Sequence, residues 1–452
     1  MVALAVVIVL LVVGSLIFHF ASPWYFTPLA SNWSTIDFTV DVTFWVCGIV
    51  FVAVNLFTAY CVWKFRARKG NKAHYEPEST KLEITLTAIT TVGVAAMLTP
   101  GLFVWAEFVN VPENATEFEA VGKQWHWSFR LPGEDNVFGA SDVRHMSVDN
   151  PLGVDPEDPN GRDDVIIASP IMHLPVNQPL KTLLRSADVL HNFTVPQFRV
   201  KMDLVPGMVT YQWFTPTVPG TYEILCEELC GAGHFAMRGK VVVDEPEAYQ
   251  AWLANQPTFA ATQAQPVGNA AAGAANYAVC SACHGPQGEG NQTLNAPKLA
   301  GLDGWYIRRQ LQSYQQGLRG TAMGDTFGPQ MAPMAQVVAA PAARENVIAF
   351  IETLPSTQPT PTVTGDAERG RALYQTCSVC HGENGAGRWG TNAPRLAGMS
   401  DWYLERQLQY FKDGVRGSHP DDVYGDQMGM VAGVLSADNA IANVIAYINT
   451  LR

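Results

Sequence analysis

The chain has 452 residues, more than one hydrophobic core usually organises, so we expect two or more domains besides any membrane part. Apolar residues make up 48% and charged residues 15%, which indicates neither an intrinsically disordered chain nor a fully membrane-embedded one. The formal net charge of -12, with a single short Lys/Arg-rich stretch, argues against nucleic acid as a partner.

Three apolar windows near the N-terminus are each close to the length that crosses a bilayer as a helix. They predict transmembrane helices at about residues 1–20, 38–65 and 83–108, within a membrane region of residues 1–110. The segment between the second and third windows is rich in Lys and Arg, whereas the segment between the first two has neither. The positive-inside rule therefore places the basic loop in the cytoplasm and everything after Trp105 on the opposite side.

The first window is also compatible with a cleaved signal peptide, because it is short and lies at the extreme N-terminus. No basic residue precedes its apolar run, and no convincing small-x-small cleavage site follows it. We therefore expect an uncleaved helix and a protein with three spans.

Alternating apolar and polar residues with Pro and Gly punctuation predict antiparallel strands in a β-rich domain at residues 111–254. A small sandwich or barrel fits the spacing of the turns. Stretches rich in Ala, Gln, Pro and Thr then predict linkers at residues 255–275 and 355–365.

The C-terminal part repeats itself. Asn295-Ala-Pro-Lys-Leu-Ala-Gly with Trp305-Tyr recurs as Asn392-Ala-Pro-Arg-Leu-Ala-Gly with Trp402-Tyr, a shift of 97 residues. Each copy closes with a run of helical periodicity. Two homologous helical domains are therefore expected at residues 276–354 and 366–452.

Each helical domain opens with a cysteine motif, Cys280-Ser-Ala-Cys283-His284 in the first and Cys377-Ser-Val-Cys380-His381 in the second. This spacing is that of covalent c-type haem attachment, in which the thiols bind the porphyrin and the adjacent His takes the iron. A redox dithiol or half of a zinc site is the alternative. It is disfavoured because the His follows both pairs at the same register.

A sixth iron ligand is expected from the far side of each domain, and Met is the usual choice where a positive potential is wanted. The repeat pairs Met331 with Met428, but distance from the closing helix favours later residues. We choose Met334 and Met430, with Met331 and Met428 as alternatives. The pair that does not bind iron has an ordinary role as filler of the core.

The β-rich region contains a third cysteine pair in Cys226-Glu-Glu-Leu-Cys230-Gly-Ala-Gly-His234-Phe-Ala-Met237, and His191 lies upstream. Thiolate, thioether and imidazole are soft to borderline donors that select copper and suit a site that changes oxidation state. Two thiolates four residues apart can bridge two copper ions. A zinc site with two Cys and two His, or a disulfide between the two Cys, is the alternative, but zinc leaves Met237 without a role.

This loop, the Ser186-Ala-Asp-Val-Leu-His191 segment and Lys201-Met-Asp-Leu-Val-Pro206-Gly resemble cytochrome c oxidase subunit II over roughly residues 38–247. The resemblance implies a cupredoxin domain that carries the binuclear copper A centre. It implies that the side chain of Glu228 contacts a magnesium ion shared with subunit I. The copper ligands it implies are His191, Cys226, Glu228 through its carbonyl, Cys230, His234 and Met237.

The same resemblance covers Gln124-Trp125-His126-Trp127, in which Trp125 is similar to the aromatic residue through which electrons enter from cytochrome c. A core aromatic is the alternative, and His126 stands where the family usually has Tyr. Glu83 resembles the acidic residue at the mouth of a proton-uptake channel. A solvated carboxylate at a helix end is the alternative there.

Residues 276–452 resemble the paired class I cytochrome c domains of small dihaem cytochromes. Together the resemblances imply a multidomain fold of transmembrane helices, an all-β cupredoxin domain and two all-α cytochrome c domains. They imply the subunit II of a proton-pumping cytochrome c oxidase, an oxidoreductase and translocase, which passes electrons from a donor such as a cytochrome or bc-type complex through two haems to copper A. Haem a of subunit I, which also holds copper B, then receives them for reduction of oxygen to water.

Subunit III is a further implied partner, and the implied location is the bacterial inner membrane, with the copper and haem domains in the periplasm. A quinol oxidase subunit would lack the copper ligands, and a nitrous oxide reductase would need a histidine-rich copper cluster that ten His cannot supply. The alternative that stays open is a membrane-bound copper and haem electron carrier that is not part of an oxidase.

Overall fold

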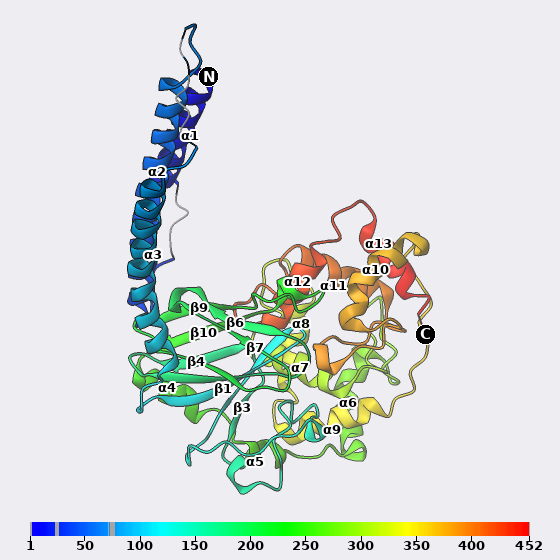
Figure 1. Ribbon diagram of the computed structural model, residues 1–452. Helices are drawn as coiled ribbons and strands as arrows, with labels where there is room; N and C mark the ends of the chain where they lie inside the picture. Colours follow the sequence, from blue (N-terminus) through cyan, green and yellow to red (C-terminus); the bar gives the residue numbers. More distant parts are fainter. Residues whose placement is uncertain (1, 23–26, 71, 73–76, 452) are drawn as a thin grey trace.

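The computed structural model of the protein describes residues 2–22, 27–70, 72 and 77–451. Met1 and Arg452, at the outer limits of the first predicted span and the last predicted domain, lie outside this range. The described chain has three parts, a helical stalk, a β-sandwich and a pair of helical domains (Figure 1). This arrangement confirms the predicted fold class.

The stalk consists of three helices that are long and apolar enough to cross a membrane. Most of their large apolar side chains are exposed, because nothing else in the described chain covers them. A helix that is apolar on all sides and unburied by protein is suited to lipid. The three helices are α1 (Val2–Ala21), α2 (Ser34–Lys64) and α3 (Thr80–Val109).

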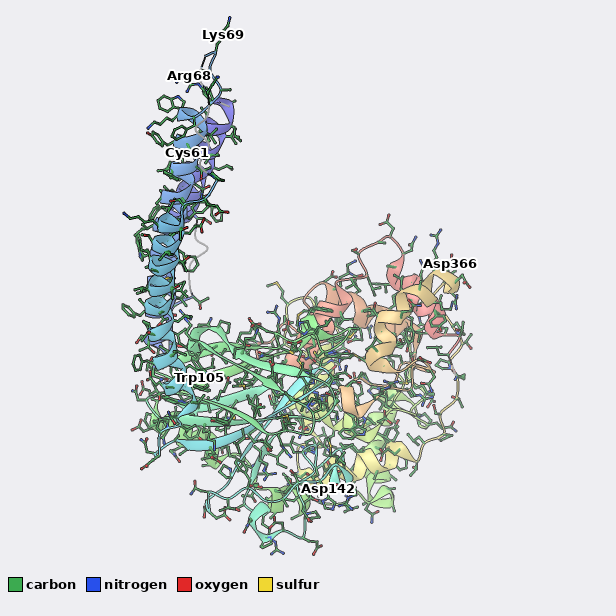
Figure 2. The ribbon with its side chains drawn as sticks, viewed as in Figure 1. Cys61, Arg68, Lys69, Trp105, Asp142 and Asp366 are labelled. Atoms are coloured by element: carbon green, nitrogen blue, oxygen red, sulfur yellow. The ribbon has the colours of Figure 1, made fainter. Side chains whose placement is uncertain are left out.

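The basic loop and the β-sandwich lie at opposite ends of the stalk. Figure 2 places Arg68 and Lys69 at the tip far from the sandwich and Trp105 next to it. A membrane around the stalk would therefore separate the two, as the charge pattern predicts.

The sandwich is held firmly on the membrane helices through the segment that joins α1 to α2. Trp33 is fully buried, and its Nε1 donates to the carbonyl of Trp213 at 3.1 Å. The Nε1 of Trp213 donates in turn to the carbonyl of Glu107 near the end of α3 at 3.2 Å. An ion pair of 2.6 Å joins Arg199 of the sandwich to Asp37 of α2. These contacts fix the position of the sandwich relative to α2 and α3.

The sandwich packs two five-stranded sheets, with strand orders β3-β2-β1-β5-β8 and β4-β10-β9-β6-β7. The prediction of antiparallel strands is partly wrong, because β1 pairs with β5 and β10 pairs with β4 in parallel. Alternation of apolar residues reports that one face of a strand is buried, and it carries no information about the direction of the neighbouring strand. The strands are β1 (Thr116–Lys123), β2 (His126–Leu131), β3 (Val165–Ile167), β4 (Ile171–Pro175), β5 (Leu180–Ser186), β6 (His191–Val195), β7 (Val200–Leu204), β8 (Thr210–Phe214), β9 (Gly220–Leu225) and β10 (Arg238–Asp244). The short 3-10 turns of this region are η1 (Val143–His145), η2 (Pro159–Gly161), η3 (Pro196–Phe198) and η4 (His234–Ala236).

The two helical domains are copies of each other, as the repeat predicts. In each, the first helix crosses the last at a glycine, because a Cβ at Gly273 or Gly370 would lie 1.9 Å from a backbone oxygen of Asn346 or Asn443. The first copy contains α6 (Ala270–His284), α7 (Gly304–Gln315), α8 (Gly328–Gln336) and α9 (Pro341–Glu352). The second contains α10 (Ala367–His381), η5 (Trp389–Thr391), α11 (Asp401–Lys412), α12 (Val423–Ala432) and α13 (Ala440–Ile448).

The first predicted linker, residues 255–275, is more ordered than its composition indicates. After α4 (Pro246–Ala254) it forms α5 (Phe259–Gln263), and α6 already begins at Ala270. Phe259 is 2% exposed against the sandwich. Alanine-rich sequence resembles low-complexity linker, but alanine is also the best helix former. The second predicted linker, residues 355–365, has neither helix nor strand.

Candidate functional sites

The cysteines of the β-domain meet His191 at one end of three adjacent strands. His191 is the first residue of β6, Cys226 directly follows β9, and Met237 directly precedes β10. Strand order β10-β9-β6 makes these three positions neighbours. The connection from β9 to β10 carries Cys230 and His234 to the same place. The sequence separation of 35 residues between His191 and Cys226 is therefore closed by the sheet itself.

Around Cys226, the sulfur lies 3.9 Å from Nδ1 of His191 and 3.3 Å from the carbonyl oxygen of Glu228. The sulfur of Cys230 is 3.8 Å away. A disulfide bond requires about 2.05 Å, so the two thiols are not bonded to each other. The disulfide alternative is therefore excluded in this structure.

Around Cys230, the sulfur lies 3.5 Å from Nδ1 of His234 and 3.7 Å from Sδ of Met237. Each sulfur thus has one imidazole and one weaker donor next to it, and the two sulfurs also lie next to each other. Two soft metal ions bridged by the thiolates use all six donors, whereas one tetrahedral zinc ion uses four. The donor set fits a binuclear copper centre.

Loss of a proton from the thiols favours binding of a cation. Because they share a hydrogen bond, the pKa of Cys226 is lowered to about 3 and the pKa of Cys230 is raised. The shared hydrogen bond thus favours one thiolate beside one thiol that keeps its proton. A metal that binds both sulfurs displaces that proton.

Two polar residues that the sequence interpretation missed orient the ligands. Asp188 accepts from Nε2 of His191 at 2.8 Å, which turns Nδ1 toward the sulfurs. The same carboxylate accepts from the backbone N–H of Gln124 at 2.8 Å, and the Gln124 side chain donates to the carbonyl of Cys230 at 2.7 Å. The position of Asp188, three residues before His191, is the only local signal that could have revealed this role.

Trp125 lies directly on the ligand loop. It is 6% exposed, and its Nε1 donates to the carbonyl of Cys230 at 3.2 Å. A Cβ at Gly233 would come within 2.5 Å of the indole ring, so only glycine admits this close approach. Both readings of Trp125 agree with its burial, and its role in electron transfer stays a prediction.

The two haem motifs occupy equivalent places at the ends of α6 and α10. Nδ1 of His284 donates to the carbonyl of Pro297, and Nδ1 of His381 donates to that of Pro394, both at 2.7 Å. This bond fixes the ring and leaves Nε2 free to bind iron. Burial lowers the pKa of both imidazoles, which keeps them in the neutral form that binds a metal.

A continuous cavity runs between the two motifs and contains both cysteine pairs, both His and three of the candidate Met. In the second domain Met428 lines it, whereas the preferred Met430 is not among its lining residues. Two residues along an α-helix correspond to a turn of about 200°, so these neighbours on α12 point in nearly opposite directions. The lining of the cavity therefore favours the alternative Met428 over the preferred Met430.

In the first domain both Met331 and Met334 line the cavity. Met331 packs against the core of the domain, whereas Met334 is 38% exposed. Met331 is also the residue that the 97-residue shift pairs with Met428. These two observations favour Met331 over Met334.

The cavity also has the charge that haem requires. Six cationic side chains line it, and none of them is in a salt bridge with a carboxylate of the described chain. One, Lys298, is 1% exposed and donates only to carbonyls and a hydroxyl, including the carbonyl of Gly398 at 2.7 Å. Because buried cations without counter-ions are unfavourable, the lining fits the propionate carboxylates of haem. The six are Lys298, Arg309, Arg319, Arg395, Arg406 and Arg416.

The two helical domains are joined by contacts that obey the 97-residue shift. Arg319 donates to Gln407 at 3.0 Å, and its counterpart Arg416 donates to Gln310 at 2.9 Å. Arg319 also donates to the hydroxyl of Tyr403 at 2.7 Å. The interface is therefore close to two-fold symmetric, and the cavity lies within it.

The second helical domain is the one that contacts the copper loop. Val379 and Cys380 pack against the core of the sandwich, and the ammonium of Lys123 lies 4.2 Å from the ring centre of Trp389. The hydroxyl of Tyr424 donates to the carbonyl of Ala168 at 2.9 Å. The haem motif of this domain thus abuts the sandwich beside Trp125.

The remaining predicted residues lie on the surface. Glu83 is exposed in the first turn of α3, at the end of the stalk that carries the basic loop. The side chain of Glu228 is partly exposed beside the copper loop.

Comparison with known proteins places these sites in context. Residues 116–245 match the family described as "Cytochrome C oxidase subunit II, periplasmic domain", and residues 270–355 and 367–452 match the family "Cytochrome c". The alternative cytochrome c oxidase subunit 2 of Bradyrhizobium diazoefficiens is 55% identical over 258 residues, which cover 57% of this chain and 93% of that protein. Cytochrome c oxidase subunit 2 of Cereibacter sphaeroides is 30% identical over 219 residues, 46% of this chain and 71% of that protein. The crystal structure of cytochrome c4 from Pseudomonas stutzeri covers 41% of this chain and 100% of its own, at 28% identity and a TM-score of 0.34. These family matches confirm both resemblances.

Proposed function

Given that this chain belongs to the cytochrome c oxidase subunit II family, we propose which of its residues bind the redox groups and in what order electrons pass through them. The chain is a membrane-anchored subunit of a haem-copper oxidase that works with subunit I, and electrons enter the enzyme through it. Binding of copper A and c-type haem follows from the two families.

For copper A we propose the six donors His191, Cys226, Glu228 through its carbonyl, Cys230, His234 and Met237. The observation that carries the proposal is the division of these donors between two sulfurs that are 3.8 Å apart and not bonded to each other. When bound, the copper pair supplies a one-electron redox site. The chain's own contribution is to hold the ligands ready through Asp188 and Gln124.

For the haems we propose Cys280, Cys283, His284 and Met331 in the first domain. The matching set in the second domain is Cys377, Cys380, His381 and Met428. Support comes from the equivalent His-to-carbonyl hydrogen bonds and from the uncompensated cations around the cavity. When bound, each haem supplies a one-electron site at the position that its domain sets.

We infer the order donor, first haem, second haem, copper A and then haem a of subunit I. The order of the haems rests on the docking of the second domain beside Trp125. Cys380 of the second haem motif packs against the sandwich core, whereas no described residue of the first motif does. Covalent tethering keeps the second domain at high effective concentration next to its acceptor. Trp125, between that domain and the copper loop, is our candidate for the residue that couples them.

The remaining proposals concern partners outside the chain. The carboxylate of Glu228 contributes to a magnesium site shared with subunit I, and Glu83 admits protons at the cytoplasmic end of the stalk. Subunit III completes the enzyme in a bacterial inner membrane, with the copper and haem domains in the periplasm. The accessible position of both carboxylates is compatible with these roles.

Composition of the purified complex tests the proposed function. We expect two copper ions in the β-domain and two c-type haems per chain, together with a polytopic subunit that contains a-type haem. Electron paramagnetic resonance should detect a mixed-valence copper pair, and pyridine-haem analysis should count the haems. Zinc in place of copper, or purification without an a-type haem subunit, would contradict the proposal.

A donor is expected to dock where the first domain exposes its haem motif. Cys283 is exposed there, and Val279 and Leu294 are 44% and 49% exposed, whereas Cys380 and Thr391, the equivalents of Cys283 and Leu294 in the second domain, are partly covered. Because this rim carries no charge, burying a Lys in it should be unfavourable. We expect Leu294→Lys to slow reduction by a soluble class I cytochrome c at least about tenfold, which corresponds to about 1.4 kcal/mol.

The matched control is Val337→Lys, which puts the same charge on another exposed apolar residue of the same domain, away from the cavity. Stopped-flow reduction of the haems compares the two variants. An equal effect of both substitutions would show that overall charge, and not this rim, governs docking.

A further inference from the structure

One side chain of the second haem domain is hydrogen-bonded both to the copper loop and to the turn between β1 and β2. Nε2 of Gln427 donates to the carbonyl of Trp125 at 2.6 Å and to the carbonyl of Ala236 at 3.0 Å. Trp125 is itself bonded to the carbonyl of Cys230, and Ala236 directly precedes Met237. The amide therefore bridges two backbone segments, each of which is one residue or one hydrogen bond away from a proposed copper ligand.

On the haem side, Gln427 is the residue directly before Met428 on α12. Residues adjacent in a helix differ in direction by about 100°, and both border the cavity, but only Gln427 reaches the backbone of Trp125 and Ala236. We propose that Gln427 is a positioning residue that sets the distance and orientation of the second haem relative to copper A. This inference rests on the proposed ligand sets and deepens them.

The chemistry of the contact requires a primary amide. The two acceptors are backbone carbonyls, and the –NH₂ group of Gln has two hydrogens, one for each. A Glu side chain has no hydrogen to donate when ionised, and Leu has none at all. Asn retains the amide but is one carbon shorter, so it cannot reach both carbonyls from the same backbone position.

Position matters here because electron transfer between two fixed centres slows steeply as their separation grows. Interfaces between domains of one chain are usually small and polar, and relative motion is the default unless specific contacts prevent it. The other contacts of this interface include those of Tyr424 and Trp389 with the sandwich and the packing of Val379 and Cys380 against its core. Gln427 alone among the described residues of this domain donates to the loop that carries the copper ligands.

The repeat supplies a natural comparison. Gln330 precedes Met331 on α8 just as Gln427 precedes Met428, 97 residues apart. Its side chain is exposed, whereas that of Gln427 is half-buried against the sandwich. The same residue type thus occurs in both domains, but it makes the contact with the copper loop in one of them only.

The test uses the complete oxidase complex with Gln427→Leu, Gln427→Glu, Gln427→Asn or the control Gln330→Leu. A covalently attached photoreductant injects an electron into the haem domains, and absorbance changes follow its transfer from the second haem to copper. We expect the Leu and Glu variants to transfer at least about tenfold more slowly, because small displacements of reacting groups are costly. Their rates should also become dependent on solvent viscosity, because redocking of the domain then limits transfer. Asn should be intermediate, and Gln330→Leu should equal the wild type.

A second measurement does not depend on turnover. Hydrogen exchange of residues 423–432 and 231–237 should accelerate in the Leu and Glu variants, with the haem spectra and the copper resonance unchanged. A wild-type transfer rate in Gln427→Leu with both centres intact overturns the proposal, and so does an equal loss in Gln330→Leu. Failure of the proposed function is distinguishable, because it would remove the copper resonance or the second haem from the wild-type complex itself.

Discussion

Replacing Cys226 with Ser is expected to abolish the mixed-valence copper resonance and to lower oxygen consumption by the complex more than about 100-fold. The sulfur of Cys226 is within 3.9 Å of His191 Nδ1, the Glu228 carbonyl and the Cys230 sulfur, so its loss affects both proposed metal ions. A serine hydroxyl is a hard donor that stays protonated, and it does not replace a bridging thiolate. Loss of an outer-shell partner alone typically costs about 10- to 100-fold, and loss of a bridging ligand should exceed that.

Both c-type haems should stay reducible in this variant, because their ligands belong to other domains. The experiment therefore measures donor-driven haem reduction and oxygen uptake in the same preparation. Cys47→Ser, in the exposed face of α2, is the matched control and should leave both signals unchanged. A full copper resonance in Cys226→Ser would refute the assignment of this thiol as a bridging ligand.

Loss of Asp188, which supports the ligand His191, should have a smaller effect on the copper resonance than loss of the ligand Cys226. Asp188 holds His191 by a single hydrogen bond and lies outside the donor set.

The contrast between Cys226 and Asp188 also explains how much of the site the sequence could predict. The donors of the loop from Cys226 to Met237 are close in sequence, so their spacing alone identifies the chemistry. Asp188 and Gln124 act through distances that only the folded sheets establish.

Contacts between domains were beyond prediction for the same reason. Gln427 lies 302 residues from Trp125, and no periodicity or motif relates the two. The direction of β5 beside β1 was equally hidden, because burial alternates in the same way in parallel and antiparallel strands. The fold class, in contrast, followed from local signals of apolar length, alternation and repeat.

The composition of the first predicted linker misled in a specific way. The alanines at residues 270–272 resemble low-complexity sequence, but Asn269 caps the helix by accepting from the backbone N–H of Ala272 at 3.0 Å. A cap followed by alanine is a helix start. The capping residue therefore indicates that the first haem domain starts at residue 270 and not at residue 276.

The choice between neighbouring methionines gives the second prediction with a large effect. Replacing Met428 with Ala should remove the thioether ligand of the second haem and lower its reduction potential by on the order of 0.1 V, within the range of about 0.8 V that axial ligands cover. Replacing Met430 should leave the potential and the low-spin spectrum unchanged, because that residue is not part of the cavity lining. Spectroelectrochemistry of each variant measures both quantities.

The same substitutions in the first domain extend the argument, with Met331→Ala expected to behave like Met428→Ala and Met334→Ala like Met430→Ala. The second haem stands directly before copper A in the proposed order, so the fall in its potential alters the two steps that involve it differently. Transfer from the first haem becomes less favourable, whereas the step to copper becomes more favourable. Electrons should therefore accumulate on the first haem in Met428→Ala. If both haems stayed oxidised instead, the order of the two haems would have to be reversed.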